Sequence, residues 1–504
     1  MRRDRRRPGA LVGAALVAGC LGASVARAGQ PGEVDLPAPA ASEPARTNMR
    51  EGPAPAAWGG TLDLPDVLRS VAAEHPQLEA AEQRLRQAEG AEMAARGGFD
   101  PVLRMRGQYI PLGGYKNGRF DVEVRQPTPL YGLQLYAGWR VGLGKFPLYD
   151  YRAKTASGGE LRAGAVLPLW QGGPIDRRRA DVRIAAIGKD AARAELEARL
   201  IELERTAARA YWTWVLTGLR RAVEQQLLEL AETRDAGLQR QIAAGSVPAV
   251  EGLDNRRAVL DRGARLVAAE RNLQQAALAL ARHLRDGDGQ MVVPGPSQLP
   301  SGFPAPARPP DDIDAIVEDA WQRRPDLLRL SLQREIARVE QKLARNNRAP
   351  KIDLEAMVAK DLGFVDPVDQ VLLPTDVVTA VTFEMPLPLR QARGNLRRAD
   401  AEVARIEAEL RFLRDSIAAE VRDAYAALVA AHARVELARA QVDAARQLAE
   451  AERTRFQRGD STLLFVNLRE QAAADAQQLE LEALADYHRA VADLRAAAGL
   501  RLGG

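Results

Sequence analysis

Cysteine, histidine and aromatic residues are scarce in this sequence, and each scarcity excludes a kind of site. Of 504 residues, 1 is cysteine, 4 are histidine, and 5% are aromatic. The single cysteine, Cys20, allows no disulfide within the chain and no cysteine-based metal or redox centre. None of the histidines has a paired metal-ligand spacing, and no glycine-rich segment ends in Gly-Lys-Ser or Gly-Lys-Thr. The sequence therefore predicts that the protein is not an enzyme and binds no cofactor or metal.

Long apolar runs are missing beyond residue 29, where no stretch reaches the roughly 18 residues that a membrane-spanning helix needs. If the mature chain crosses a membrane, it must therefore do so as strands of a closed β-barrel. The start of the chain differs from the rest. An arginine-rich head precedes an apolar stretch over residues 10–25, which predicts a secretory signal over residues 1–28.

Two cleavage positions fit that signal. Cleavage before Cys20, after Val17-Ala18-Gly19, would leave a lipidated cysteine at the new N-terminus. Cleavage after Ala26-Arg27-Ala28 would instead remove Cys20 with the signal. Either position predicts an exported protein.

The charge of the chain does not favour nucleic acid as a partner. The formal net charge is +4, and the first seven residues, with five arginines and one aspartate, account for all of it. The rest of the chain is neutral overall, whereas nucleic-acid-binding domains carry a basic surface. We therefore expect no nucleic-acid partner.

The chain is organised as two similar halves. Segments rich in proline cover residues 29–60, which we interpret as an N-terminal arm, and residues 286–311, which we interpret as a linker. Pro76 and Pro101 recur as Pro325 and Pro350 at an offset of 249, while Tyr211 and Gly245 recur as Tyr425 and Gly459 at an offset of 214. So long a period indicates a duplicated half rather than a solenoid. The predicted repeats are residues 61–285 and 312–504.

Each half shows the 3.6-residue apolar periodicity of long helices. We predict helices over residues 65–96, 176–244, 250–285, 312–345, 395–458 and 464–498. In each half the two shorter helices together match the long one, which predicts a column of roughly 100 Å with the short helices stacked end to end. Pro76 and Pro325 mark positions where a short lead-in helix would break.

Between the helices, four segments alternate apolar and polar residues with the period of a β-strand. They cover residues 130–143, 160–169, 350–359 and 376–385. Apolar residues outside and polar residues inside are typical of a membrane barrel, although a sheet on a soluble core is the other interpretation. About four strands cannot close a barrel, so several copies would be needed.

The first half is longer than the second between its strands. The additional residues contain an alternating segment, 119–126, and most of the strand at 130–143. They form either an outer loop hairpin or further barrel strands. Tyr131, Trp139 and Trp170 are candidates for an aromatic belt at the membrane interface, with ordinary packing as the alternative.

The order of these segments resembles the TolC-like outer-membrane efflux protein family. The resemblance covers residues 60–500 and includes Thr61-Leu62-Asp63-Leu64, then His75-Pro76, and a turn that reads Phe456-Gln457-Arg458-Gly459-Asp460-Ser461-Thr462-Leu463. It implies a mainly helical fold with transmembrane strands. Three copies would share one twelve-stranded barrel in the outer membrane, joined to a helical tunnel in the periplasm. It also implies a periplasmic adaptor protein and an inner-membrane transporter as partners.

The resemblance further implies a closing constriction near the tips of the helical hairpins. In the family, acidic residues stand six residues after the tip glycine and, in one hairpin, also nine residues after it. The first hairpin has Glu251 and Asp254 there, whereas the second has Phe465 and Leu468. A ring of carboxylates would favour cations, and Phe465 would instead make an apolar constriction. Glu251 and Asp254 also suit a first helical turn on electrostatic grounds alone.

The two hairpin turns are the expected contacts for the adaptor. These residues are Gly245, Ser246 and Val247 in the first turn and Gly459, Asp460 and Ser461 in the second. Glycine permits the turn, and Ser246 or Ser461 can cap the returning helix. Capping alone would also explain their presence.

Two other classes of protein remain as alternatives. A periplasmic adaptor also has long helical hairpins, but it would show one hairpin flanked by small β-domains. A coiled-coil protein without a pore would not need the strand segments. The sequence does not distinguish export of drugs, metals or proteins.

Overall fold

The computed structural model describes residues 60–147, 154–246, 248–364 and 375–503. The predicted signal over residues 1–28, Cys20, the arm over residues 29–59 and Val247 lie outside these residues. The predictions made for them stay predictions.

Eight α-helices form two sets that follow each other in the described chain. The first set is α1 (Leu64–Glu74), α2 (Pro76–Arg96), α3 (Arg177–Ala243) and α4 (Ala249–Ala281). The second is α5 (Ile313–Arg323), α6 (Pro325–Asn346), α7 (Arg390–Gln457) and α8 (Leu463–Ala497). The duplication predicted from the offsets is therefore visible as a repeated order of helices.

The helices expected over residues 65–96 and 312–345 are each broken into two. His75 and Arg324, the residues before Pro76 and Pro325, have extended backbone with ψ of 123° and 116°. A proline ring clashes with the helical conformation of the residue before it, so the helix stops there and restarts at the proline. His75 then serves as N-cap of α2, its Nδ1 accepting from the N–H of Gln77 at 3.3 Å.

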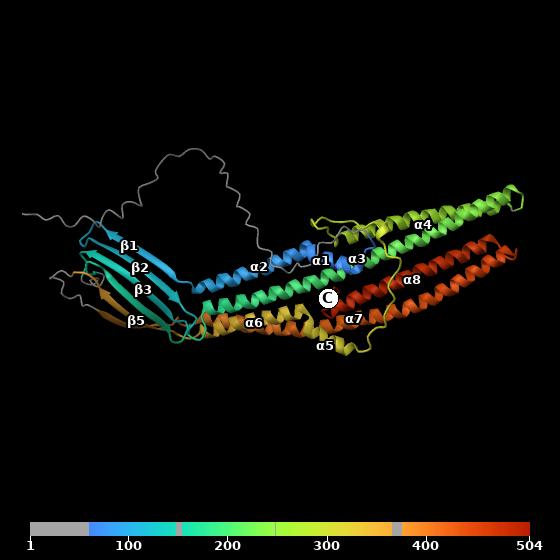
Figure 1. Cartoon of the computed structure of the whole chain (residues 1–504). Helices are drawn as coiled ribbons and strands as arrows, with labels where there is room; N and C mark the ends of the chain where they lie inside the picture. Colours follow the sequence, from blue (N-terminus) through green and yellow to red (C-terminus); the bar gives the residue numbers. More distant parts are fainter. Residues whose placement is uncertain (1–59, 148–153, 247, 365–374, 504) are drawn as a thin grey trace, which may run out of the picture. The chain divides into compact units, whose positions relative to one another are not determined.

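The short helices pack along the long ones as expected. Helices α2 and α4 both contact α3, and α6 and α8 both contact α7 (Figure 1). The core of the first half surrounds Trp214 and Leu280, and the core of the second half surrounds Val421 and Tyr487. Among the described residues, no helix is both long and apolar enough to cross a membrane.

The linker over residues 286–311 is docked on the helices. Phe303 packs against the cores of both halves. The Tyr487 hydroxyl accepts from the N–H of Ala307 at 3.0 Å and donates to its carbonyl at 2.8 Å. Leu299 lies over Gly218 of α3, where a Cβ would come within 2.4 Å of the leucine side chain. The linker therefore joins the two halves through packing as well as through the chain.

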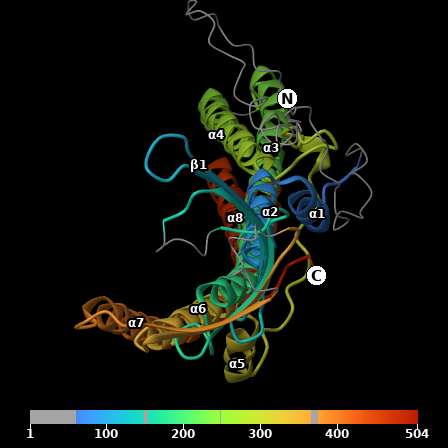
Figure 2. The ribbon, with the colours of Figure 1, turned by 90° about the vertical axis from the view of Figure 1, so that its left-hand side faces the viewer.

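Six strands form one antiparallel sheet at the end of α2, α3, α6 and α7 (Figure 1). They are β1 (Val102–Ile110), β2 (Asn117–Pro127), β3 (Gln134–Gly144), β4 (Glu160–Pro168), β5 (Lys351–Asp361) and β6 (Asp376–Glu384). Neighbours in the sheet are neighbours in sequence, and β4 pairs with β5 to join the two halves. Figure 2 shows the sheet from its own end and shows that it is curved.

The expectation of about four strands in each chain is wrong. Strand β1 was not predicted, although Leu103, Met105 and Tyr109 alternate there with Arg104, Arg106 and Gln108. The segment expected as a strand from residue 130 begins only at Gln134. Residues 130–133 form a tight turn, in which the N–H of Leu133 donates to the carbonyl of Leu130 at 2.9 Å.

That turn explains the shorter strand. Tyr131 and Gly132 both have positive φ, 50° and 74°, as the two central residues of a type I′ turn require. The turn lies within residues 128–133, which connect β2 to β3. Tyr131 therefore belongs to the connection and not to the strand.

Candidate functional site

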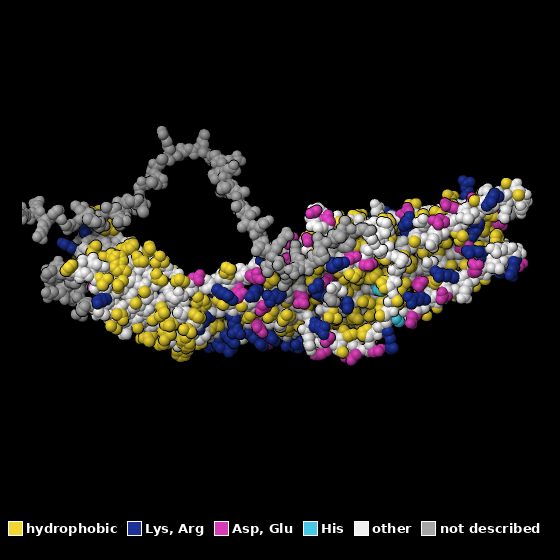
Figure 3. All heavy atoms as spheres, viewed as in Figure 1, with side chains coloured by type: hydrophobic (Ala, Val, Ile, Leu, Met, Phe, Trp, Pro, Cys, Tyr) yellow, Lys and Arg dark blue, Asp and Glu magenta, His cyan; other side chains and the backbone are white. Residues whose placement is uncertain are grey.

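The sheet has one apolar face, and that face is exposed. Its apolar side chains come from all six strands, and half or nearly half of the surface of Leu135, Leu161 and Val358 is uncovered (45%, 50% and 50%). The register places Val358 beside Ala163 and Val377, and Leu161 beside Trp139, so the face is continuous across strands. Figure 3 shows hydrophobic side chains gathered over the sheet, while charged side chains of both signs cover the helices.

The opposite face of the sheet is polar and better covered. Arg140 pairs with Glu160 at 2.6 Å, and Arg162 pairs with Asp121 at 2.7 Å and Glu123 at 3.1 Å. Tyr136 and Glu160 are 7% and 5% exposed. A sheet in a water-soluble protein buries its apolar face and exposes its polar face. Here the arrangement is reversed, which suits apolar surroundings on one side and water on the other.

The two hairpin tips have the same backbone geometry. Gly245 and Gly459 follow α3 and α7 with φ of 72° and 85°. The next N–H group, of Ser246 or Asp460, donates back to the carbonyl of Gln241 or Arg455 at 2.9 Å in each case. This is the Schellman ending, in which a glycine in the left-handed region lets the chain reverse. The sequence prediction that these glycines make the turns is confirmed.

The prediction that Ser246 or Ser461 caps the returning helix is wrong. The N-cap residues are Pro248 for α4 and Thr462 for α8, and neither makes a side-chain capping hydrogen bond. The Ser246 hydroxyl donates to the carbonyl of Gln241 at 3.2 Å, on the outgoing helix. The Ser461 hydroxyl bonds to the carboxylate of Glu452, also on the outgoing helix. Both serines therefore hold the end of the first helix of their hairpin.

The predicted constriction residues lie within the first two turns of α4 and α8. Glu251 is half-buried and Asp254 is exposed. Phe465 and Leu468 occupy the matching positions in the second hairpin and are 50% and 58% exposed. The tips thus differ in chemistry, acidic in the first hairpin and apolar in the second, although their backbones agree. The structure of one chain does not bring these residues into one site.

The three predicted interface aromatics do not lie at one level. Tyr131 and Trp170 are in loops at the helical end of the sheet, where Tyr131 lies against Gly173 and the Trp170 carbonyl accepts from Asn346 at 3.4 Å. Trp139 is on β3, and its indole N–H donates to the carbonyl of Gly158 at 2.9 Å in the turn that precedes β4. Tyr131 and Trp170 would lie at one edge of a membrane and Trp139 toward the other edge. The aromatic belt therefore stays a prediction.

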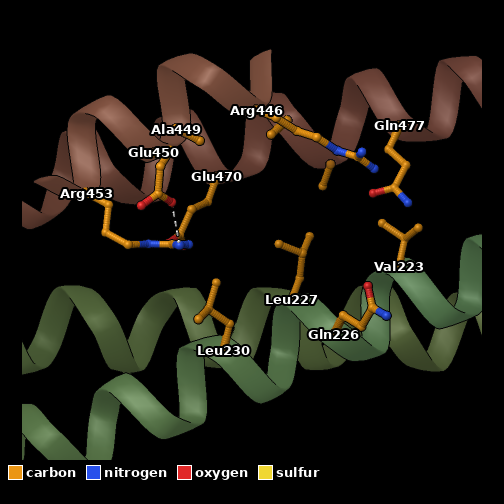
Figure 4. A pocket seen from close by; sticks show the side chains of 12 residues that line it. Val223, Gln226, Leu227, Leu230, Arg446, Ala449, Glu450, Arg453, Glu470 and Gln477 are labelled. Carbon is orange, nitrogen blue, oxygen red and sulfur yellow. Dashed lines mark hydrogen bonds and ion pairs between the residues drawn. The ribbon is translucent and has the colours of Figure 1, made fainter. Parts of the chain in front are cut away.

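An ion cluster between the two hairpins was not predicted. Glu470 of α8 is 4% exposed. Its carboxylate forms ion pairs with Arg234 of α3 at 2.5 Å, Arg453 of α7 at 3.3 Å and Arg262 of α4 at 3.4 Å. We call these four residues the hairpin cluster. Two of its members, Glu470 and Arg453, line a pocket between α3, α7 and α8. Figure 4 shows the end of Arg453 beside Glu470 and below Glu450, opposite Leu227 and Leu230. Each of the four hairpin helices contributes one residue to the hairpin cluster.

The buried histidines serve packing. His75 and His283 stack with ring centres 5.7 Å apart, and His488 stacks on Trp212 at 4.4 Å. Burial lowers the pKa of His283 to about 4 and also lowers the pKa values of His75 and His488. These rings are neutral at pH 7, so they add no charge to the helices. No group of three or more potential metal ligands occurs among the described residues.

Comparison with known proteins agrees with this geometry. Residues 316–500 match the family model described as outer membrane efflux protein. The fold is similar to that of the outer-membrane channel OprN (16% identity, 88% of this chain, 90% of that chain, TM-score 0.62). It is also similar to the CmeC channel of Campylobacter jejuni (14% identity, 86% of this chain, 85% of that chain, TM-score 0.61). A third similar structure is VceC of Vibrio cholerae (17% identity, 87% of this chain, 96% of that chain, TM-score 0.60). No curated protein matches the chain closely enough to count as a relative.

Proposed function

We propose, from the premise that this chain is a TolC-like outer-membrane efflux protein, that three copies of it enclose one exit duct. The sheet would lie in the outer membrane and the helices would extend into the periplasm. The alternative of a periplasmic adaptor does not fit, because two duplicated halves share one sheet where an adaptor would have one hairpin between small β-domains. The family and its structural neighbours are channels.

The observation that carries the proposal is the reversed sheet. An exposed apolar face over six strands is costly in water, at about 25 cal/mol for each Å² of apolar surface. The same face is stable against lipid. The ion pairs on the other face need water or one another, as they would have in a lumen. One chain alone leaves this arrangement incomplete, since no strand of the described residues pairs with the outer edge of β1 or of β6.

Pairing between copies would complete the sheet. Unpaired backbone groups at a sheet edge are not tolerated in a bilayer, so β6 of one copy would pair with β1 of the next. The directions agree, because the six strands alternate and β6 is therefore antiparallel to a following β1. A closed ring of copies satisfies every edge. Three copies follow from the family resemblance.

The helices also present surfaces for neighbouring copies. Leu253, Leu260 and Val267 of α4 recur every seven residues and are 67–69% exposed. Leu437 and Leu448 of α7 are 72% and 52% exposed. Exposed apolar stripes along a helix are stable in water only when another helix covers them. Copies packed side by side would cover both stripes.

Partners of the duct would dock at the hairpin tips. We propose that the turns at Gly245 and Gly459 contact a periplasmic adaptor protein, and that an inner-membrane transporter supplies the energy. The shared Schellman geometry gives both tips the same backbone surface, which suits one adaptor that contacts both. The role itself rests on the family resemblance.

The membrane assignment predicts a face-dependent effect of charge. Val358→Arg places a guanidinium on the apolar face and is expected to cost about 2–4 kcal/mol near the middle of a bilayer. The amount of assembled trimer in outer-membrane fractions should fall accordingly. Met357→Arg is the matched control, because Met357 directly precedes Val358 in β5 and projects from the polar face. Equal losses in both variants would show that the apolar face does not meet lipid.

The constriction predicts a change in conductance. In planar bilayers the purified trimer should give discrete single-channel steps, and Glu251→Ala with Asp254→Ala should raise the conductance and weaken the preference for cations. The control is Asp261→Ala with Glu270→Ala, which removes two acids further along α4. It should leave the conductance and the preference for cations unchanged. If the tip variant behaves like the control, Phe465→Ser should raise the conductance instead. Absence of conducting steps from correctly inserted trimer would contradict the channel itself.

A further inference from the structure

The hairpin of β2 and β3 has no counterpart among the described strands of the second half. Strands β1 and β5 each follow a helix that starts at a matched proline, Pro76 or Pro325. Strands β4 and β6 each lead into a long helix, α3 or α7. The pairs β1 with β5 and β4 with β6 therefore correspond through the duplication. Strands β2 and β3 stand between β1 and β4 as an addition to the first half.

The added hairpin is paired with the rest of the sheet on both of its sides. Strand β2 pairs with β1 from Val102 opposite Arg125 to Ile110 opposite Asn117. Strand β3 pairs with β4 from Gln134 opposite Val166 to Arg140 opposite Glu160. Both faces continue through it, with Phe120, Val122 and Val124 on the apolar side. A surface loop laid over the sheet would not continue the ladder or its two faces.

Two side chains each reach across one strand of the sheet to contact the strand beyond it. Arg162 of β4 crosses β3 and pairs with Asp121 and Glu123 of β2. It crosses at Gly138, which lies between Glu123 and Arg162 in the register and has no side chain to block it. The crossing arginine is 17% exposed, so the pairs are well covered.

The second tie runs the other way across the sheet. The ring of Tyr136 on β3 lies over Gly164 of β4, where a Cβ would come within 2.5 Å of the ring. Its hydroxyl donates to the Glu355 carboxylate of β5 at 2.6 Å. A glycine beneath each crossing side chain allows both ties. The sheet is therefore built around six strands rather than extended by a loose pair.

We propose that this hairpin widens the duct, so that three copies enclose a sheet of eighteen strands rather than the twelve expected from the family resemblance. The inference rests on the proposed function, since it assumes three copies joined edge to edge. The width of a closed sheet grows roughly in proportion to its strand number. Six strands in place of four make the circumference half as large again. Closed sheets of 16–18 strands leave an aqueous channel, so the exit would admit bulky cargo in water.

The first test is the strand count of the natural protein. Electron cryo-microscopy of the trimer in lipid nanodiscs should show eighteen strands around the threefold axis, with β2 and β3 in the wall. Twelve strands in the wall of a trimer would overturn the inference and leave the channel function standing. Failure to form any trimer would instead contradict the proposed function on which the inference rests.

A second test asks which way the added hairpin faces. Asp121→Cys and Val122→Cys place thiols on the two faces of β2, and the natural protein with Cys20 alone sets the background. A membrane-impermeant thiol reagent should label Asp121→Cys through the lumen and leave Val122→Cys, which faces lipid, at background. Equal labelling of both would place the hairpin outside the membrane wall and overturn the inference.

Discussion

Replacing Glu470 with glutamine is expected to lower the free energy of unfolding by about 3–5 kcal/mol, the usual cost of breaking a buried ion pair by removing one partner. The Glu470 carboxylate is the only acid among the four residues of the hairpin cluster and lies between three guanidinium groups. Glutamine keeps the shape of the side chain but removes the charge that these groups share.

Arg262 makes this effect large. It is 3% exposed, and burial lowers its pKa even though Glu470 acts in the opposite direction. Its Nη1 also donates to the carbonyl of Leu227 at 2.9 Å. Without Glu470, a buried cation would lack a counter-charge on α8. The hairpins α3–α4 and α7–α8 would then separate at this point.

Denaturant titration of the purified protein would measure the loss, and single-channel recording would measure its effect on the proposed duct. We expect Glu470→Gln to raise the conductance, because separation of the hairpins would loosen the tips that lie beyond the cluster. Asp475→Asn is the matched control, because Asp475 is an exposed acid on the same helix that accepts from the side-chain amide of Gln471 at 2.7 Å. A Glu470→Gln trimer with the stability and conductance of the control would show that the cluster does not hold the hairpins together.

Glu204→Gln is expected to release the C-terminal tail from the first half of the chain. Glu204 of α3 is 1% exposed and accepts from Nε and Nη2 of Arg501 at 3.0 and 2.9 Å and from the N–H of Leu502 at 2.7 Å. The amide group of glutamine offers one acceptor oxygen where the carboxylate offers two. Each buried donor left without a partner costs about 1–3 kcal/mol, so the loss should be about 3 kcal/mol.

The release can be followed directly. Carboxypeptidase should remove the residues after Leu500 from the Glu204→Gln variant faster than from the natural protein, and the unfolding midpoint should fall. Glu202→Gln provides the control, because Glu202 is on the same helix, 44% exposed, and pairs only locally with Arg205 among the described residues. Equal digestion of the two variants would mean that Glu204 does not anchor the tail.

The long helices and the duplication could be predicted because both are periodic in the sequence. Apolar spacing of 3.6 residues persists over α3 and α7, and the matched prolines and glycines keep constant offsets. The boundaries of α3, α7 and α8 are within five residues of those expected. The polar and apolar alternation in the strands likewise anticipated the two faces of the sheet.

Other features failed for identifiable reasons. Apolar and polar residues alternate in β1, but Gly107 interrupts its apolar face and Arg104 and Arg106 occupy its polar face. The strand was therefore not predicted. At Tyr131 the alternation of apolar and polar residues continues from the strand into the turn. The positive φ of Tyr131, which the sequence does not reveal, distinguishes the turn from the strand. The hairpin cluster has no signature at all, because its residues come from four helices and Arg234 is 236 positions from Glu470. Contacts of that kind depend on packing between hairpins, which spacing within one helix does not reveal.

The added hairpin also limits how ducts of this kind can diversify. Strand β1 leaves the helical end of the sheet and β4 returns to it, because α3 must start beside the end of α2. In the proposed trimeric duct, an insertion of one strand would deliver the chain to the far side of the membrane, so strands would be gained or lost only in pairs. Each such event would change the wall by six strands. The width of the exit would therefore change in discrete steps, while loop lengths and side chains would adjust it only between them.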